Sequence, residues 1–412
     1  MTDRSASNNV LLAPVLQKIE SEYSAKRAEQ LQLFARKYFA SAANSLLANA
    51  DEEELFADVQ AAWRFLQTRQ SATPKLELVH HTDQSGEYPS ETQIFLLLND
   101  MPFVIDSIRQ CLNRMGAVVH QVNNTVVYCK RSPRKQGKGG KLQAIAANAE
   151  TGYRGEAISS IRCAYLSEEQ CAVIAKEIKT TLKFVTAAVK DFAPMVERAE
   201  EVRQALLANG ESLPVSQEEL TEASEFIAWL INNHFTFLGY EQYRLTHRGK
   251  SKTMALQRDS LLGVSRYKRE IKYRAKLNQL PAGTAEVILR QQICSFAKSS
   301  IRSRVHRPAY YDYLLLKEFD SEGNVVVEHR FTGLYTSSVY YRPAMDIPLV
   351  RAKVRNVMER SGFSPNGHNS KDLMQVINAF PREELFQMSA DQLFGTAMEI
   401  TRIQDTRTCK VF

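Results

Sequence analysis

The densest group of residues that could bind an anion lies in the basic stretch "IRSRVHRPAYYDY". Arg302, Arg304 and His306 alternate along this stretch, and Arg307 follows directly. On an extended chain, alternate side chains share one face, where these could hold a phosphate or a carboxylate through charge-assisted hydrogen bonds. A salt-bridged surface or a domain interface uses the same residue types. The sequence favours this second interpretation, because no other feature of the chain indicates a phosphate or nucleic-acid site.

Patterns typical of catalysis are missing from the sequence. It has no GxGxxG after a strand, no HExxH and no GxSxG. The adjacent His80 and His81 would point to opposite faces of a strand, so they do not predict a shared metal site. The six cysteines form no CxxC pair, which argues against a zinc site and against a disulfide framework. We therefore predict no catalytic, cofactor-binding or metal-binding residue in this chain.

A second candidate site is the stretch "NDMPFVIDSI", which begins at Asn99 and leads from an apolar run into a helical pattern. Asp100 is predicted to cap this helix, Pro102 to lie in its first turn, and Gly116 to end it in the left-handed conformation. Such a corner can hold a small ligand or act as a structural joint. Pro102 lacks an N–H group and Phe103 is bulky, which favours the joint.

The elements around these stretches predict an α+β chain of several domains. A chain of 412 residues, 44% of them hydrophobic, is long enough for two or three domains with separate cores. Ser167 with Gln170 and Ser389 with Gln392 predict helix starts, and the proline of "FAP" at 192–194 predicts a break between helices. The expected pattern is helices over 13–69, mixed elements over 75–206, a linker over 211–217, a helix and strands over 219–340 with a hairpin turn at 320–323, and helices over 346–402.

Composition and charge limit which partners and which cellular compartment the sequence predicts. No apolar run approaches the roughly 18 residues that span a bilayer, and the first residues lack the layout of a secretory signal. We expect a cytoplasmic protein without a membrane partner. The net charge of +7 is modest for this length and does not predict a nucleic-acid partner.

Several long blocks carry a resemblance to a known family. They are "NDMPFVIDSI", "HFTFLGYEQYRL", "SIRSRVHRPAYYDYLLLKEFDSEGNVVVEHRFTGLYTSSVY" and "DIPLVRAKVRNVMERSGFSPNGHNSKDLMQVINAFPREELFQM". From about Lys75 to Phe412 the chain closely resembles the amino-terminal part of the large NAD-specific glutamate dehydrogenases of bacteria. In that family this region precedes the catalytic domain and holds ACT-like and PAS-type modules.

The resemblance implies a multidomain α+β fold, an ACT-like ferredoxin-type α/β sandwich followed by a PAS-type antiparallel-sheet domain, with flanking helical segments. The terminal "RTCKVF" would be the first strand of a further module. The implied domains are a helical lead-in over 1–72, a first ACT-like domain over 73–210, a PAS-type α+β domain over 215–345, a helical segment over 346–405, and the truncated start of another ACT-like domain over 406–412.

The resemblance also implies a function, with two alternatives. The chain would be a non-catalytic regulatory or oligomerisation portion of an enzyme that deaminates L-glutamate to 2-oxoglutarate. NAD would be the cofactor of the full-length enzyme, and this chain would hold none. The partners would be the catalytic domain of the same polypeptide and further copies in a homo-oligomer. The portion could be a scaffold or a metabolite-sensing module that controls the catalytic domain, and we favour the scaffold.

Overall fold

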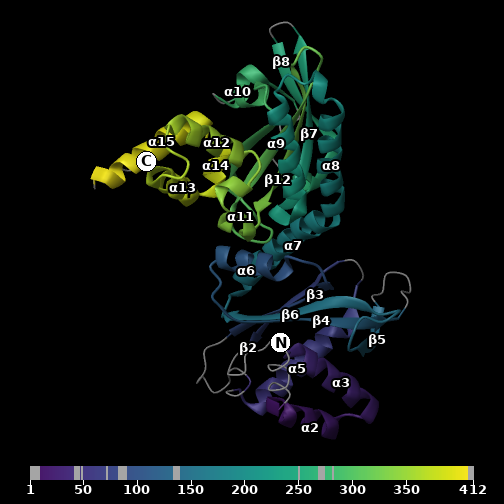
Figure 1. Cartoon of the computed structure of the whole chain (residues 1–412). Coiled ribbons are helices and arrows are strands. Elements are labelled where there is room, and N and C mark those ends of the chain that lie inside the picture. The colour runs from purple at the N-terminus through teal and green to yellow at the C-terminus, as the bar shows by residue number, and fades with distance from the viewer. Residues whose placement is uncertain are drawn as a thin grey trace. The chain divides into compact units, whose positions relative to one another are not determined.

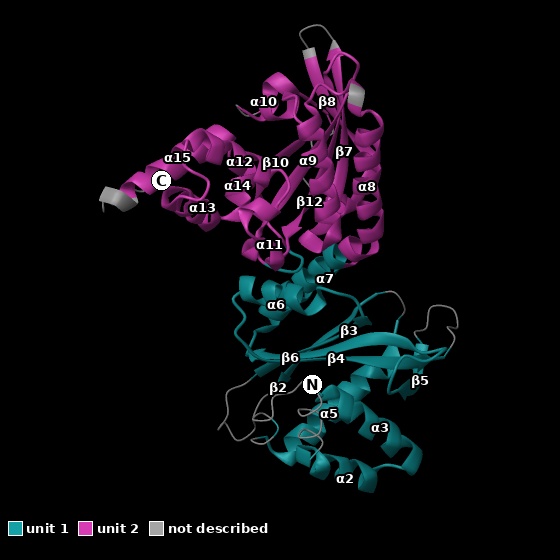
Figure 2. Cartoon of the chain, in the orientation of Figure 1, with its two compact units in different colours: residues 1–185, 304–307 teal, residues 186–303, 308–412 magenta. Residues whose placement is uncertain are grey.

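The computed structural model describes residues 10–40, 47, 50–70, 73–81, 91–132, 140–248, 251–267, 274–280 and 283–406. The chain divides into two compact units (Figure 2). Unit 1 holds Met1–Val185 with Arg304–Arg307, and unit 2 holds Thr186–Ser303 with Pro308–Phe412. In the described residues each unit contains one antiparallel six-stranded sheet together with helices. The predicted α+β class is therefore confirmed. The predicted strand "RTCKVF" lies outside the described residues.

The sheet of unit 1 has the strand order β1-β5-β4-β6-β3-β2. Each pair of neighbouring strands is antiparallel. Its strands are β1 (Thr68–Arg69), β2 (Lys75–His81), β3 (Glu91–Asn99), β4 (Val119–Arg131), β5 (Gly140–Ala146) and β6 (Arg154–Ala164).

Helices cover both faces of this sheet (Figure 1). One face carries α6 (Val104–Arg114) and α7 (Glu168–Lys190), and the other carries α2 (Ala13–Glu22), α3 (Ala25–Tyr38) and α5 (Glu52–Leu66). Helices α2, α3 and α5 share one apolar core with the sheet. This core contains helix residues such as Leu31, Phe34 and Val59 and strand residues such as Phe95 and Ile158. Antiparallel sheets commonly leave one face to water. Here neither face is left open, and seven consecutive positions of β3 are buried.

The start of α7 follows the expected local chemistry. The Ser167 amide donates to Gln170 Oε1 over 2.9 Å, and the Gln170 amide donates to Ser167 Oγ over 3.2 Å. This reciprocal pair is a capping box, and it confirms the helix start that the sequence predicts at Ser167. The break expected near Pro194 is also confirmed, because α7 ends at Lys190 and α8 (Phe192–Ala208) begins two residues later.

The sheet of unit 2 has the strand order β10-β11-β12-β7-β8-β9. The predicted hairpin turn between β11 and β12 is confirmed, since the Gly323 amide donates to the Asp320 carbonyl over 3.0 Å and Gly323 has a φ of 80°. The strand expected to reach Tyr340 ends at Tyr335, and α11 (Ser337–Tyr341) follows it. The strands are β7 (Phe235–Arg248), β8 (Ser251–Gly263), β9 (Arg274–Lys276), β10 (Cys294–Arg302), β11 (Tyr310–Phe319) and β12 (Val325–Tyr335).

Helices α8 and α9 and the carboxyl-terminal helices share one core with this sheet. A smaller core lies around Tyr243, Met254 and Ile288 and includes α10. None of the described helices combines the length and the apolar character needed to cross a membrane. The further helices are α9 (Gln217–Trp229), α10 (Thr284–Leu289), α12 (Val350–Ser361), α13 (His368–Ala379), α14 (Arg382–Gln387) and α15 (Ala390–Thr406), and short 3-10 or π turns lie at Gly210–Ser212, Leu230–His234, Val264–Tyr267, Leu277–Gln279 and Ala344–Asp346.

Candidate functional site

The first candidate site is the corner between β3 and α6 in unit 1. Its helix is preceded by Phe103, which is the N-cap residue and has a left-handed φ of 70°. The prediction that Asp100 caps this helix is wrong. The Asp100 amide donates to the Gly155 carbonyl over 3.2 Å, so the chain still follows the neighbouring strand there. The chain turns at Pro102 and Phe103, so the prediction that Pro102 lies in the first turn of the helix is also wrong. Gly116, by contrast, has the predicted left-handed conformation beyond the helix, with a φ of 75°.

The other corner residues contact their own unit. Asn99 accepts a hydrogen bond at Oδ1 from Arg69 Nη1 over 2.8 Å. Pro102 is exposed and Phe103 is half-buried. The Phe103 carbonyl accepts hydrogen bonds from the amide and the hydroxyl of Ser107, over 3.0 and 2.5 Å. These two bonds satisfy the first carbonyl of the helix from within its own first turn.

The space beside this corner is occupied by residues 304–307, which belong to unit 1 although β10 and β11 flank them in the chain. The His306 ring lies against the Phe103 ring, with 5.0 Å between centroids. The His306 amide donates to Ser107 Oγ over 3.0 Å, and His306 Nδ1 lies 3.9 Å from an Asp106 carboxylate oxygen. Burial lowers the pKa of His306, and the charge of Asp106 opposes that shift. The corner therefore contacts an aromatic ring and a backbone amide of its own chain.

An ion pair holds the same segment to α7. Arg304 Nη1 lies 2.6 Å from Glu177 Oε2, and Arg114 Nη2 lies 3.3 Å from the same oxygen. The hydrogen bond from Arg304 lowers the pKa of Glu177. The Arg304 guanidinium also lies over the Phe184 ring, 5.9 Å from its centroid. Arg304 thus binds a carboxylate of the protein itself.

The basic stretch is not extended, so the condition for one shared anion-binding face is not met. The chain bends between β10 and β11, and His306 has a φ of 70°. Arg302 ends β10 in unit 2, with its guanidinium 5.1 Å from the Tyr310 ring centroid. Arg304, His306 and Arg307 follow in the bend, which is counted with unit 1. The alternation seen in the sequence therefore does not translate into one shared face.

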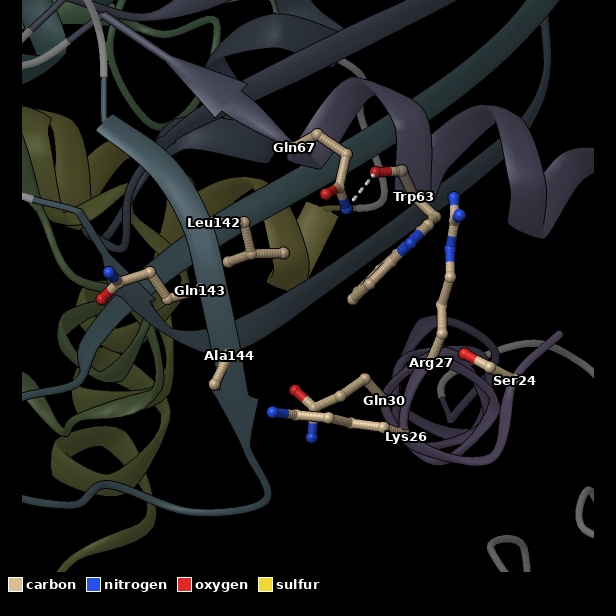
Figure 3. A pocket seen from close by; sticks show the side chains of 9 residues that line it. All are labelled: Ser24, Lys26, Arg27, Gln30, Trp63, Gln67, Leu142, Gln143 and Ala144. Carbon is tan, nitrogen blue, oxygen red and sulfur yellow. Dashed lines mark hydrogen bonds between the residues drawn. The ribbon is translucent and has the colours of Figure 1, made fainter.

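A pocket that the sequence reasoning missed lies in unit 1 between α3, α5 and β5 (Figure 3). Its volume is about 290 Å³. One signal in the sequence could have indicated it: two cations in the first turn of a helix, where the helix dipole disfavours positive charge. The pocket is lined by Ser24, Lys26, Arg27, Gln30, Trp63, Gln67, Leu142, Gln143 and Ala144.

Other charged side chains are buried in structural networks. In unit 2, Arg330 lies 2.6 Å from Glu328 and 3.6 Å from Glu241, and its guanidinium lies over the Tyr243 ring. The pair of Arg330 on β12 with Glu241 on β7 links two neighbouring strands of the sheet. In the described ranges, no group of three or more His, Cys, Asp or Glu residues is arranged to hold a metal ion.

Comparison with known proteins places these features in a family context. A model described as the ACT1 domain of glutamate dehydrogenase matches residues 34–178, and one described as glutamate dehydrogenase helical motif 1 matches residues 347–406. The first match contains the β3–α6 corner and the pocket lining on α5 and β5, but not the lining residues Ser24 to Gln30 at the start of α3. The second contains α12 to α15. The matched ranges therefore fall in both units.

Full-length relatives agree with these matches. The NAD-specific glutamate dehydrogenase of Pseudomonas aeruginosa is 35% identical over 395 residues, which are 94% of this chain and 24% of that protein. The protein of the same name from Halomonas elongata is 31% identical over 98% of this chain and 25% of its own length. The one from Mycobacterium tuberculosis is 23% identical over 75% of this chain. The chain spans about a quarter of the length of the first two relatives, and it is a region of the large NAD-specific glutamate dehydrogenases, the region with their ACT1 domain and helical motif 1.

Proposed function

We propose that this chain is a non-catalytic assembly and regulatory portion of an NAD-specific glutamate dehydrogenase. In the complete protein, catalytic domains of the same polypeptide would oxidise L-glutamate to 2-oxoglutarate with NAD as the cofactor. This portion would lie at the amino-terminal side of those domains and would support a cytoplasmic homo-oligomer. On the same proposal, the antiparallel sheet and helices of unit 2 form a PAS-type module.

The observation that carries the scaffold role is the occupied β3–α6 corner. His306 covers Phe103 and its amide bonds to Ser107 Oγ, while Arg304 pairs with Glu177. A ligand at this corner would have to displace all three interactions. Each interaction is made within the chain, so replacing it by a ligand contact gains little free energy. The corner is therefore suited to holding protein elements together.

Metabolite sensing is the second candidate function, and the pocket of Figure 3 is the observation that favours it. A sensing module needs a site that binds its ligand more tightly in one state of the protein than in the other. The pocket has the concave shape of such a site and does not overlap the corner residues Asn99 to Phe103.

Sedimentation velocity and an activity assay of the full chain test the proposed function. We expect association that increases with protein concentration, and no glutamate-dependent reduction of NAD. A strictly monomeric chain over a wide concentration range contradicts the assembly role. Turnover by the chain alone contradicts the non-catalytic role.

Thermal unfolding with added L-amino acids separates the scaffold from a sensor at the corner, because a ligand of the native state raises the midpoint. If the chain is a scaffold, no amino acid should raise the unfolding midpoint by binding at the β3–α6 corner. A shift that persists after Lys26 and Arg27 in the pocket are both changed to Gln, and that disappears in Ser107→Ala, would assign sensing to the corner and overturn the scaffold.

A further inference from the structure

We infer that the pocket between α3, α5 and β5 binds a small anion that carries a carboxylate or phosphate group. The inference rests on the pocket alone and holds whether the chain acts as a scaffold or as a sensor. Four observations support it: the charge of the lining, the absence of carboxylates there, the fixed walls and the volume.

Two cationic side chains line the pocket, and both come from the start of α3. Lys26 and Arg27 lie in the first turn of α3, and that turn contains no acidic residue. The aligned peptide dipoles already give the start of a helix a positive potential. Two cations there are therefore destabilised by this potential and by their mutual repulsion. Within the part of the chain that the structure describes, no carboxylate is among the nine lining residues. A bound anion would neutralise this charge.

The walls are held in place by hydrogen bonds between elements. Gln30 of α3 accepts a bond at Oε1 from the Ile145 amide of β5 over 2.7 Å. The Gln67 carbonyl, just after α5, accepts one from the Leu142 amide of β5 over 2.8 Å, and its side-chain amide donates to the Trp63 carbonyl over 3.1 Å. The three elements are thus tied together without a ligand. A preformed site avoids the loss of freedom that would otherwise weaken binding.

The remaining wall is apolar and aromatic. The Trp63 side chain lines the pocket, as Figure 3 shows, and its ring packs on the Phe34 ring with centroids 5.3 Å apart. Glutamine side chains, Gln30, Gln67 and Gln143, supply polar groups around it. Six of the nine lining side chains are therefore polar or charged, and the apolar part of the wall consists of Trp63, Leu142 and Ala144.

The volume restricts the size of the ligand. About 290 Å³ is at the lower end of the range for small-molecule pockets. An organic acid or a sugar phosphate fits such a volume. Lys26 or Arg27 would hold the anionic group, and Trp63 would contact the carbon skeleton.

Calorimetric titration of the full chain with citrate and with inorganic phosphate tests the inference, with choline chloride as the cationic control. The pocket variant combines Lys26→Gln and Arg27→Gln. The matched control combines Lys176→Gln and Lys179→Gln, two exposed cations of α7 outside the pocket, and removes the same charge. We expect saturable binding of at least one anion, weakened about tenfold or more in the pocket variant and less than about twofold in the control.

A second readout locates the binding. The chain has two tryptophans, and Trp63 lines the pocket. Anion binding should change the tryptophan emission of the parent, and Trp63→Phe should abolish that change. A response to phosphate alone assigns a phosphate ligand, and one to citrate alone assigns a carboxylate. The inference is overturned if neither anion saturates, if both double variants lose affinity equally, or if the emission change survives in Trp63→Phe.

Discussion

The rings of Phe103 and His306 lie with their centroids 5.0 Å apart, and each of the two residues has a left-handed φ of 70°. Residues with a Cβ rarely adopt this backbone conformation, and each such residue carries roughly 1 to 3 kcal/mol of strain energy. Two strained residues in contact persist because their surroundings hold both. Ser107 does so here, since it bonds to the Phe103 carbonyl and to the His306 amide.

Substitutions at Phe103 should separate backbone strain from side-chain packing. Phe103→Ala removes the ring contact but keeps the strain, so we expect the free energy of unfolding to fall by about 2 kcal/mol, less than for a fully buried aromatic. Phe103→Gly removes the same ring and tolerates the positive φ. It should be about 1 kcal/mol more stable than Phe103→Ala in urea denaturation. Asp100→Ala is the control and should change stability by less than about 0.5 kcal/mol, because Asp100 does not cap the helix. An alanine variant as stable as the glycine variant would contradict the strain.

The Arg304–Glu177 pair should contribute stability that depends on pH. Arg304 lowers the pKa of Glu177 in the folded state. The contribution is therefore complete above the ordinary glutamate pKa of about 4.3 and is lost as the pH falls through the lower folded value. Because Arg304 is about one-third exposed, we expect a coupling of only about 0.5 to 1 kcal/mol at pH 7.

A double-mutant cycle of Arg304→Gln and Glu177→Gln measures this coupling. Repeating the cycle near pH 3 should reduce it. A coupling that is the same at both pH values would show that the pair does not act through the Glu177 charge.

Lys353 of α12 should stabilise the helices that match helical motif 1. Its ammonium donates to the carbonyls of Leu385, Phe386 and Met388, over 3.0, 2.9 and 2.8 Å. These three carbonyls lie at the end of α14, where the last carbonyls of a helix lack partners within the helix. The Lys353 ammonium supplies the missing donors. Lys353→Met keeps the length and loses the donors, so the free energy of unfolding should fall by about 2 kcal/mol. The same change at the exposed Lys371 should cost less than about 0.5 kcal/mol.

The stability difference between the parent and Lys353→Met should also depend on pH. Burial lowers the pKa of Lys353 to about 8, whereas the unfolded chain keeps this proton up to about pH 10.4. Between these values the unfolded state binds more protons, so raising the pH favours the folded parent. The difference measured by denaturation should therefore grow from pH 8 to pH 10. A constant difference would mean that Lys353 has an ordinary pKa.

Glu222 of α9 should be sensitive to loss of its charge. It is buried and accepts hydrogen bonds from the Leu349 amide, Arg351 Nε and Arg355 Nη2, over 2.8, 2.8 and 2.7 Å. Burial raises its pKa, but these donors outweigh burial and hold the pKa below its usual value. Glu222→Gln should lower the free energy of unfolding by about 2 to 3 kcal/mol at pH 7.

The effect of Glu222→Gln should shrink as the pH falls below the ordinary glutamate pKa of about 4.3 and through the lower folded value, where the parent carboxylate also takes up a proton. Glu218→Gln, an exposed change on the same helix, is the control. Equal losses in the two variants would contradict the role of burial.

Local chemistry was readable from the sequence, and contacts between distant segments were not. The capping box at Ser167, the hairpin turn at Asp320 and the left-handed Gly116 each depend on a few neighbouring residues. A shared face on the basic stretch would require an extended chain, whereas the chain bends at His306, whose amide contacts Ser107, 199 positions away. The pocket was missed because it needs α3, α5 and β5 together.

The two covered faces of the unit 1 sheet have a consequence for how β3 finds its pairing register. In a sheet with one wet face, a slip of one residue exposes apolar side chains and is rejected. Strand β3 is buried on both sides from Thr92 to Leu98, so this penalty is weak. Two polar side chains of β3 distinguish the native register from a slipped one. Gln93 donates to Asp58 and Ser160 toward the α5 layer, and Thr92 accepts from the Leu166 amide ahead of α7. A slipped strand would bury both groups without partners, so two hydrogen-bonding residues align an otherwise apolar strand.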